Sequence, residues 1–185
     1  SYVVADLESM VCAIIDPVLE LEESSAEITT RGVQKILEHL RKNELTCEYI
    51  LETHAHADHL SAGYFLKQRL VAPIGIGKSI VDVQHVFGEM YSETSSFKRD
   101  GSQFDLLLAD GQKLALGRFS IEAMHVPGHT PACMAYKVGH AVFVGDTLFM
   151  PDSGTARCDF PGGSASELYR SIPVSYTHLT LPTKS

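Results

Sequence analysis

A run of seven residues in the first third of the chain gathers side chains that bind metal ions: Thr53-His54-Ala55-His56-Ala57-Asp58-His59. Three imidazoles and a carboxylate are costly to crowd together unless a cation holds them, because each ring nitrogen and the charge need a partner. Dense groups of His and Asp mark metal sites. The spacing differs from the helical His-Glu-x-x-His pattern of zinc proteases, whose two His lie on one helix face. We therefore predict a metal site in a loop that can fold around two adjacent metal positions.

The sequence on either side of this run predicts the elements that position it. Residues 47–52, Cys-Glu-Tyr-Ile-Leu-Glu, are apolar and rich in β-forming residues, which is typical of a buried strand. Residues 60–70 show a helical pattern. The predicted ligands therefore follow the C-terminal end of a strand, where α/β sheets usually carry their chemistry.

The rest of the chain predicts alternating strands and helices, followed by a second half that is mostly β. Apolar runs at 2–5 and 10–15 predict a hairpin at a sheet edge, and a helix is predicted from Ser24 or Ser25 to Asn43. Further elements are expected as a strand at 73–76, a short helix at 80–87, a hairpin joining 106–108 to 113–116 through Asp110-Gly111, and strands at 119–126, 132–138 and 141–144. We interpret His85, His125 and His140 as structural residues.

Two later motifs complete a known pattern: Pro127-Gly128-His129-Thr130 and Gly145-Asp146-Thr147-Leu148-Phe149. Together with His-x-His-x-Asp-His after a hydrophobic strand, they resemble the signature of the metallo-β-lactamase superfamily. The resemblance implies the α/β fold of that family, an αββα sandwich in which two mixed sheets face each other with helices outside. It also implies that His129 and Asp146 supply further metal ligands.

The stretch from Ala156 to Phe160, which reads Ala-Arg-Cys-Asp-Phe, narrows the resemblance to one branch. This segment and the later Leu-Tyr-Arg-Ser-Ile at 168–172 look like the persulfide dioxygenase branch, whereas the related glyoxalase II shares only the metal motifs. The resemblance implies one Fe(II) per chain, held by His54, His129 and Asp146 as catalytic ligands. Two imidazoles and one carboxylate form the facial triad of non-haem iron oxygenases and leave positions open for substrate.

The reaction that this resemblance implies is the oxidation of glutathione persulfide, or a similar low-molecular-weight persulfide, by O2 to sulfite and a thiol. His56, Asp58 and His59 would then orient the iron ligands. The resemblance also favours Arg157 as a substrate-binding residue, because a planar guanidinium matches the carboxylates of glutathione. A surface ion pair with Asp152 or Asp159 is the alternative for Arg157.

A hydrolase that uses the same residues is the alternative function. In a glyoxalase II-like thioester hydrolase (hydroxyacylglutathione hydrolase), two Zn or a mixed Zn/Fe pair would hold a bridging hydroxide. His56 would then join the first metal, while Asp58, His59 and Asp146 would bind the second with a later His. The family pattern places that His in a His-Asp-Tyr motif, which this sequence does not contain.

The last residues, 173–185, resemble translated sequencing-adapter read-through rather than the family's C-terminal pattern. We therefore expect residues 1–172 to form a metallo-β-lactamase-like domain that is incomplete at both ends and truncated at its C-terminus, and 173–185 to be a non-native tail. A third hypothesis follows, in which the chain is an inactive metal-binding fragment.

The composition describes one compact domain with an acidic surface. The chain has 185 residues, 44% of them hydrophobic, and a net charge of −8, which argues against nucleic acid or an anionic membrane as a partner. The expected partners are a small-molecule substrate and O2, with a homodimer left open. No apolar stretch is long enough to span a membrane, so we expect a cytoplasmic protein. Four scattered cysteines, Cys12, Cys47, Cys133 and Cys158, are predicted to be buried thiols rather than disulfides or zinc ligands.

Overall fold

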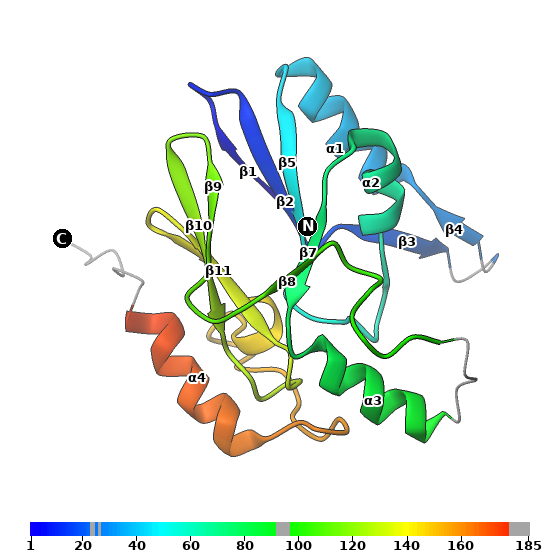
Figure 1. Ribbon diagram of the computed structural model, residues 1–185, viewed down its shortest axis with the longest axis vertical. Helices are drawn as coiled ribbons and strands as arrows, with labels where there is room; N and C mark the ends of the chain where they lie inside the picture. The colour runs from blue at the N-terminus through cyan, green and yellow to red at the C-terminus, as the bar shows by residue number, and fades with distance from the viewer. Residues whose placement is uncertain (23–24, 26, 92–96, 178–185) are drawn as a thin grey trace.

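Two facing β-sheets form the centre of the computed structural model, which describes residues 1–22, 25, 27–91 and 97–177 (Figure 1). The first sheet is ordered β1 (Tyr2–Asp6), β2 (Val11–Ile15), β5 (Thr46–Leu51), β7 (Ile74–Gly77) and β8 (Leu106–Leu108). Only its edge strand β1 runs antiparallel to its neighbour. The second sheet is antiparallel throughout and is ordered β12 (Ala141–Phe143), β11 (Met134–Val138), β10 (Phe119–His125) and β9 (Lys113–Leu116).

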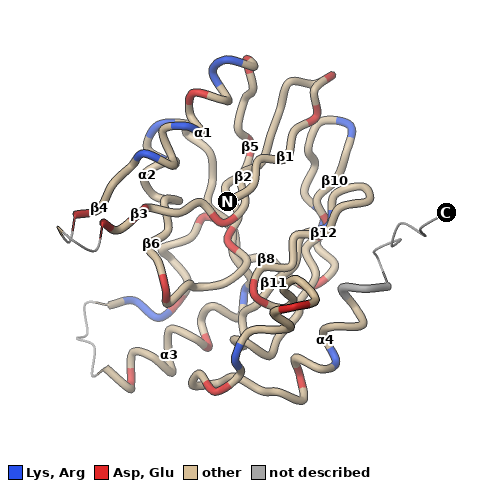
Figure 2. Tube along the Cα trace, turned by 180° about the vertical axis from the view of Figure 1, so that it is seen from behind, with Lys and Arg blue, Asp and Glu red and all other residues tan. Residues whose placement is uncertain are grey.

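Helices cover the outer faces of these sheets, as the predicted sandwich requires. Helices α1 (Arg31–Lys42) and α2 (Gly63–Leu70) lie on the first sheet, and α4 (Ala165–Thr177) lies beside the second (Figure 1). Helix α3 (Ile80–Met90) follows β7, and a 3-10 turn, η1 (Gly145–Thr147), follows β12. A small sheet is ordered β4 (Glu27–Thr29), β3 (Val18–Glu22) and β6 (Leu60–Ser61). Figure 2 shows basic residues along α1 and α2.

The alternation of side chains along β2 and β5 builds two cores from the same strands. Ile14 and Ile50 are fully buried against α1 and α2, whereas the next residues along, Ile15 and Leu51, point into the space between the sheets. Tyr136 of the second sheet is also buried there and donates its hydroxyl to the Glu52 carbonyl, 2.8 Å away. Each buried aliphatic side chain contributes about 1.5–3 kcal/mol of transfer free energy.

An ion pair joins the two sheets at one end of the sandwich. Asp6, the last residue of β1, accepts hydrogen bonds from the Arg118 main-chain N–H at 2.8 Å and from its guanidinium NH2 at 3.1 Å. Arg118 lies in the turn between β9 and β10. These bonds hold the pKa of the Asp6 carboxyl well below its usual range. The candidate metal ligands lie at the opposite end, after β5 and β10.

The predicted hairpin through Asp110-Gly111 is wrong. Strand β8 pairs in parallel with β7 in the first sheet, while β9 belongs to the second sheet, so this turn carries the chain from one sheet to the other. The turn is held by β10, because the Gly111 N–H donates to the Ala123 carbonyl at 2.8 Å. The Asp110 side chain likewise accepts from the His125 N–H at 2.8 Å.

The predicted helix start at Ser24 or Ser25 is also wrong. Strands β3 and β4 pair across this region, and α1 begins only at Arg31. The Ser25 N–H donates to the Glu22 carbonyl at 3.3 Å, which is a turn between strands; Ser24 lies outside the described residues. Serine stabilises turns as well as helix N-termini, so the residue type alone does not separate the two.

Helix α4 continues across the predicted domain boundary at residue 172 as far as Thr177, and residues 178–185 of the predicted tail lie outside the described residues. The four cysteines are free thiols, and Cys158 alone among them is partly exposed. In the part of the chain that the structure describes, each helix is too short or too polar to cross a membrane.

Candidate metal centre

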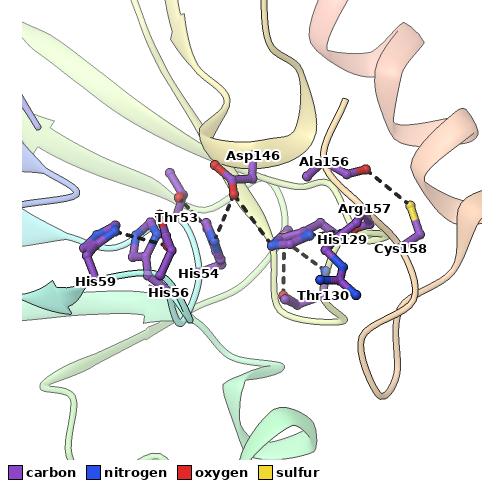
Figure 3. Close-up of polar contacts among 12 residues, drawn as sticks. Thr53, His54, His56, His59, His129, Thr130, Asp146, Ala156, Arg157 and Cys158 are labelled. Carbon is purple, nitrogen blue, oxygen red and sulfur yellow. Dashed lines mark hydrogen bonds and ion pairs between the residues drawn. The ribbon is translucent and has the colours of Figure 1, made fainter. Parts of the chain in front are cut away.

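Three predicted ligands from three separate elements meet at one end of the sandwich (Figure 3). His54 follows β5, His129 follows β10, and Asp146 lies in η1 just beyond β12. The Nε2 atoms of His54 and His129 each lie 3.7 Å from Oδ2 of Asp146. One donor atom from each residue lies within 4.8 Å of the other two. Two imidazoles and a carboxylate at this spacing can surround a single cation.

The hydroxyl of Thr53 orients the first imidazole. Thr53 Oγ1 donates its one hydrogen to Oδ2 of Asp16 at 2.9 Å, so at 3.0 Å from Nδ1 of His54 it can only accept. Nδ1 of His54 therefore carries the ring hydrogen, and the lone pair of Nε2 faces Asp146. Hydrogen bonds of this kind fix the tautomer of metal-binding His.

The second imidazole is oriented by a main-chain carbonyl. Nδ1 of His129 lies 2.7 Å from the carbonyl oxygen of Arg157, which can only accept. Nδ1 therefore carries the hydrogen, and Nε2 again presents its lone pair to the group. Both rings thus offer a metal ion the nitrogen that the geometry brings together, and the donor set fits a metal without rearrangement of either ring.

A glycine of the third motif lets η1 approach this arrangement. Gly145 has φ +52°, in the left-handed region, and a Cβ at this position would lie 2.4 Å from Oγ1 of Thr53. A side chain here would strain the backbone and displace the Thr53 hydroxyl. The Gly-Asp pair therefore places the Asp146 carboxylate while it leaves room for the hydroxyl that orients His54.

Burial keeps the His54 imidazole neutral without a metal. His54 is 2% exposed, and burial, with the neighbouring His56 and His129, lowers its pKa to about 3. Burial raises the pKa of Asp146, against the lowering effect of His129 and His56. A neutral imidazole is the form that binds metal.

His56, the second imidazole of the first motif, lies beside His54, with ring centroids 4.0 Å apart, but its Nε2 contacts residues outside the group of His54, His129 and Asp146. Its Nε2 lies 3.3 Å from Oδ1 of Asp16 and 3.7 Å from Oε2 of Glu52. Burial lowers the pKa of His56, but the hydrogen bond and charge of Asp16 outweigh burial and raise it. Burial also raises the pKa of Glu52, to about 8. His56 is thus held by two buried carboxyl groups rather than by the metal group.

The last two residues of the first motif lie on the other side of His56. Nδ1 of His59 lies 3.2 Å from Oδ1 of Asp58, and the His56 and His59 rings stack with centroids 4.2 Å apart. One donor atom each from His56, Asp58 and His59 falls within 4.8 Å of the others, so this is a second group that could hold a metal ion. The structure therefore separates the cluster predicted from the sequence into two groups.

Sequence reasoning missed Asp16, which joins both groups. It accepts the Thr53 main-chain N–H at 2.7 Å, the Thr53 hydroxyl, and a contact from His56. Asp16 is buried and has φ +48°, a conformation that a non-glycine residue rarely adopts. Its one local signal is its position directly after a strand and before Pro17, which typifies a turn rather than a site.

Arg157 lies at the mouth of the site with its guanidinium on the surface. Nε and NH2 donate to the two carboxylate oxygens of Asp159 at 2.6 and 2.7 Å, and both side chains are exposed. This is one of the two ion pairs anticipated as the alternative for Arg157. Its guanidinium also lies 4.9 Å from the ring centroid of Phe160. In this structure, the contribution of Arg157 to the metal group is its carbonyl.

Several hollows reach the metal group, and two of them adjoin His129. One, of about 470 Å³, is lined by His54, His129 and Asp146 together with Arg157 and Phe149. The other, of about 410 Å³, lies between His129 and helix α3. The metal group is therefore accessible from more than one side.

This fold and the three ligand motifs define a metallo-β-lactamase domain, and the chain belongs to the Metallo-beta-lactamase superfamily, whose family model matches residues 1–181. The resemblance stated from the motifs is thus confirmed, including its relation to persulfide dioxygenases. A probable metallo-hydrolase of Burkholderia pseudomallei is 50% identical over 93% of this chain and 62% of its own length. Glyoxylase B2 of Dictyostelium discoideum is 42% identical over 92% and 59%. Human mitochondrial persulfide dioxygenase ETHE1 is 30% identical over 93% and 56%.

A solved structure agrees with the arrangement of the sheets. The crystal structure of ETHE1 from Myxococcus xanthus superposes with a TM-score of 0.69 at 27% identity, over 93% of this chain and 62% of that chain. This chain spans 56–62% of the length of the three relatives, so their activities extend to it only as proposals.

Proposed function

We propose that this chain is the catalytic domain of a persulfide dioxygenase that uses a single Fe(II) held by His54, His129 and Asp146. One observation carries the proposal: the two imidazoles and the carboxylate form a separate group, whereas His56 lies against Asp16 and Glu52. A hydrolytic site with three imidazoles on its first metal needs His56 in that group. The relation to ETHE1 at 30% identity supports the same assignment.

The overall reaction conserves atoms and charge. A persulfide R–S–S⁻, O2 and water give the thiol R–SH and hydrogen sulfite. The terminal sulfur loses four electrons, the two atoms of O2 gain them, and water supplies the third oxygen of sulfite while the S–S bond breaks. Bound Fe(II) would supply the redox chemistry that couples O2 to the sulfur.

The protein's own residues prepare this chemistry by holding ligands and limiting water. Thr53 and the Arg157 carbonyl keep both Nε2 lone pairs directed at one point. The Asp146 carboxylate adds one negative charge, which leaves a divalent cation with a net positive charge that attracts an anionic persulfide. Phe160 contacts the His129 ring edge to face, with centroids 5.3 Å apart, and covers the ligand from the outside.

A thioester hydrolase is the second candidate, and a specific observation favours it. His56, Asp58 and His59 place donor atoms within 4.8 Å of one another, so a second metal could bind beside the first. Two of the relatives carry hydrolase or glyoxylase names. This function would require His56 to leave Asp16. The inactive fragment stays the third hypothesis, and a cytoplasmic location and a homodimer stay predictions.

Metal counting and two substrate assays on the full chain test the proposal. Protein produced in iron-replete medium should carry at most one iron, consume O2 with glutathione persulfide, form one sulfite per O2, and hydrolyse S-lactoylglutathione poorly. His54→Ala should remove the iron, while His56→Ala should retain it, and the exposed His140 provides a matched control, His140→Ala.

Each other outcome points to a different function. Two zinc ions per chain with brisk thioester hydrolysis and no O2 consumption would establish the hydrolase instead. One bound iron without turnover of S-lactoylglutathione or of any persulfide tested would establish the inactive fragment. Loss of iron from His56→Ala would show that the two metal groups are not independent.

A further inference from the structure

An apolar hollow opens beside the metal group, between His129 and helix α3. We call it the aromatic hollow and define it by its apolar lining residues Ile80, Val83, Phe87, Phe97, Phe104 and Phe160. Its volume is about 410 Å³. His56, His129 and Thr130 line its inner end, so a molecule with one end at the metal group can place its other end here.

The polar side chains at this hollow are already hydrogen-bonded to the protein. The Gln84 amide donates to Oε1 of Gln103 at 2.8 Å, and its own oxygen accepts the Gly101 N–H at 2.9 Å. Nε2 of Gln103 donates to the Lys98 carbonyl at 2.7 Å. A polar ligand would have to break these bonds, because buried amides without partners are costly.

Among the described residues, this hollow is lined by no long charged side chain, and its two imidazoles, His56 and His129, face Asp16 and Asp146. None of those that line it is Lys, Arg, Asp or Glu. Helix α3 carries acidic residues but no basic ones (Figure 2). At the neighbouring hollow the one guanidinium is that of Arg157, which is bound to both oxygens of Asp159.

We propose that the aromatic hollow binds the organic group of the substrate, and that this group is apolar, such as an alkyl or benzyl group. This inference rests on the proposed persulfide dioxygenase function and refines its substrate. Glutathione carries two carboxylates, which would lose water in a pocket whose described lining has no Lys or Arg to pair with them. An apolar group gains the transfer free energy of its buried surface. The persulfide sulfurs would then lie toward His129 and the metal group.

Product thiols test this specificity without turnover. Phenylmethanethiol and glutathione present the same thiol and differ only in the attached organic group, so the ratio of their dissociation constants reports on the hollow. Calorimetric titration of the iron-loaded full chain under anaerobic conditions should give at least about tenfold tighter binding of phenylmethanethiol. The ratio of kcat/KM for the two persulfides should favour the benzyl compound in the same direction.

Phe97 offers variants that need not disturb the core, because it is 39% exposed at the mouth of the hollow. Phe97→Ala should weaken phenylmethanethiol about fivefold, and Phe97→Lys should weaken it and strengthen glutathione. Phe119, which is 44% exposed on β10 and does not line the hollow, provides the control Phe119→Ala, expected to change neither constant.

The outcomes separate this inference from the proposed function. Glutathione binding as tightly as phenylmethanethiol, or equal effects of Phe97→Ala and Phe119→Ala, would overturn the apolar specificity even if sulfite is formed. Absence of sulfite from both persulfides would instead overturn the dioxygenase function. The inference, which rests on that function, would fall with it, and the thiol ranking would then describe only a binding pocket.

Discussion

Replacing Thr53 by valine isolates the role of one hydroxyl in the metal centre. Valine keeps the shape of threonine, but it can neither donate to Asp16 nor accept from Nδ1 of His54, contacts of 2.9 and 3.0 Å. The Thr53 main-chain N–H still donates to Asp16 at 2.7 Å, so the loop keeps one anchor. His54 then loses the acceptor that fixes its tautomer, and either ring nitrogen can carry the hydrogen.

Two magnitudes follow from these contacts. Loss of an outer hydrogen bond to a metal-binding His weakens metal affinity about 10–100-fold, which corresponds to about 1.4–2.7 kcal/mol. Loss of a hydrogen bond to a charged carboxylate lowers the free energy of unfolding by about 1.5–3 kcal/mol, because Thr53 is 1% exposed and water cannot replace the bond. We therefore expect both metal affinity and stability to fall.

Competition with a chromophoric chelator measures the first effect, and chemical denaturation of the metal-free protein measures the second. Thr147→Val is the matched control, because Thr147 is also 1% exposed and lies in η1, yet its hydroxyl has no hydrogen-bond partner among the described residues. Removing that hydroxyl should leave metal affinity unchanged and should not lower stability. Nitrogen chemical shifts of the His54 ring should show one tautomer in the wild type and a mixture in Thr53→Val.

Metal binding by Thr53→Val within twofold of the wild type, or equal weakening by Thr147→Val, would refute the orienting role of the Thr53 hydroxyl. A single unchanged His54 tautomer in Thr53→Val would show that another group orients the ring.

Three further predictions concern residues near the metal group and at the opposite end of the sandwich. Arg157→Ala keeps the main-chain carbonyl that accepts from His129, so iron content measured by metal analysis should stay within about twofold of the wild type. The free energy of unfolding should change by no more than about 1 kcal/mol, as for an exposed ion pair. Loss of iron would contradict the view that only the carbonyl of residue 157 serves the metal group. Gly145→Ala should lower both iron content and melting temperature, because its Cβ would meet Oγ1 of Thr53 at 2.4 Å; normal values of both would contradict the close approach. Asp6→Asn should destabilise the protein in denaturation curves at pH 7 more than at pH 3. The pKa of Asp6 in the folded protein lies below its unfolded value of about 3.9. The stability that the Asp6–Arg118 pair contributes is therefore complete above about pH 3.9 and falls as the pH drops toward the folded pKa. Equal destabilisation by Asp6→Asn at both pH values would refute this pH dependence.

Local patterns predicted most individual strands, because the apolar runs or alternation of a buried strand can be recognised in the sequence without knowing which strand it pairs with. Strands β5 and β10 match their predicted ranges closely, and so does the edge hairpin of β1 and β2. The turn at Asp110-Gly111 shows that local patterns do not predict which strands pair. Its residues favour a tight turn, but the choice of sheet for β8 depends on pairing with β7, about 30 residues earlier, which no local pattern encodes.

The candidate site was likewise predictable from the sequence only in part. The residue types and spacing of the first motif predicted a metal site, and the resemblance supplied His129 and Asp146, which the structure brings to His54. The sequence does not reveal that His56 faces Asp16 instead, because these residues are 40 positions apart and their contact depends on the parallel pairing of β2 with β5. Asp16 belongs to no sequence motif, so its role is recognised only from its contacts in the structure.

The crossing at Asp110-Gly111 also sets the order in which a nascent chain can acquire its metal. Every strand of the first sheet is synthesised before any strand of the second, and of the three grouped ligands only His54 belongs to this first portion. Once a ribosome has passed residue 112, it has synthesised all strands of the first sheet but none of the strands that pack against its inner face. Of the three grouped ligands, only His54 is then present. His129 and Asp146 emerge later, when β10 and β12 can close over that face. Stable loading of a metal on the group of His54, His129 and Asp146 must then follow closure of the sandwich, and an ion bound there shows that the two sheets have packed together.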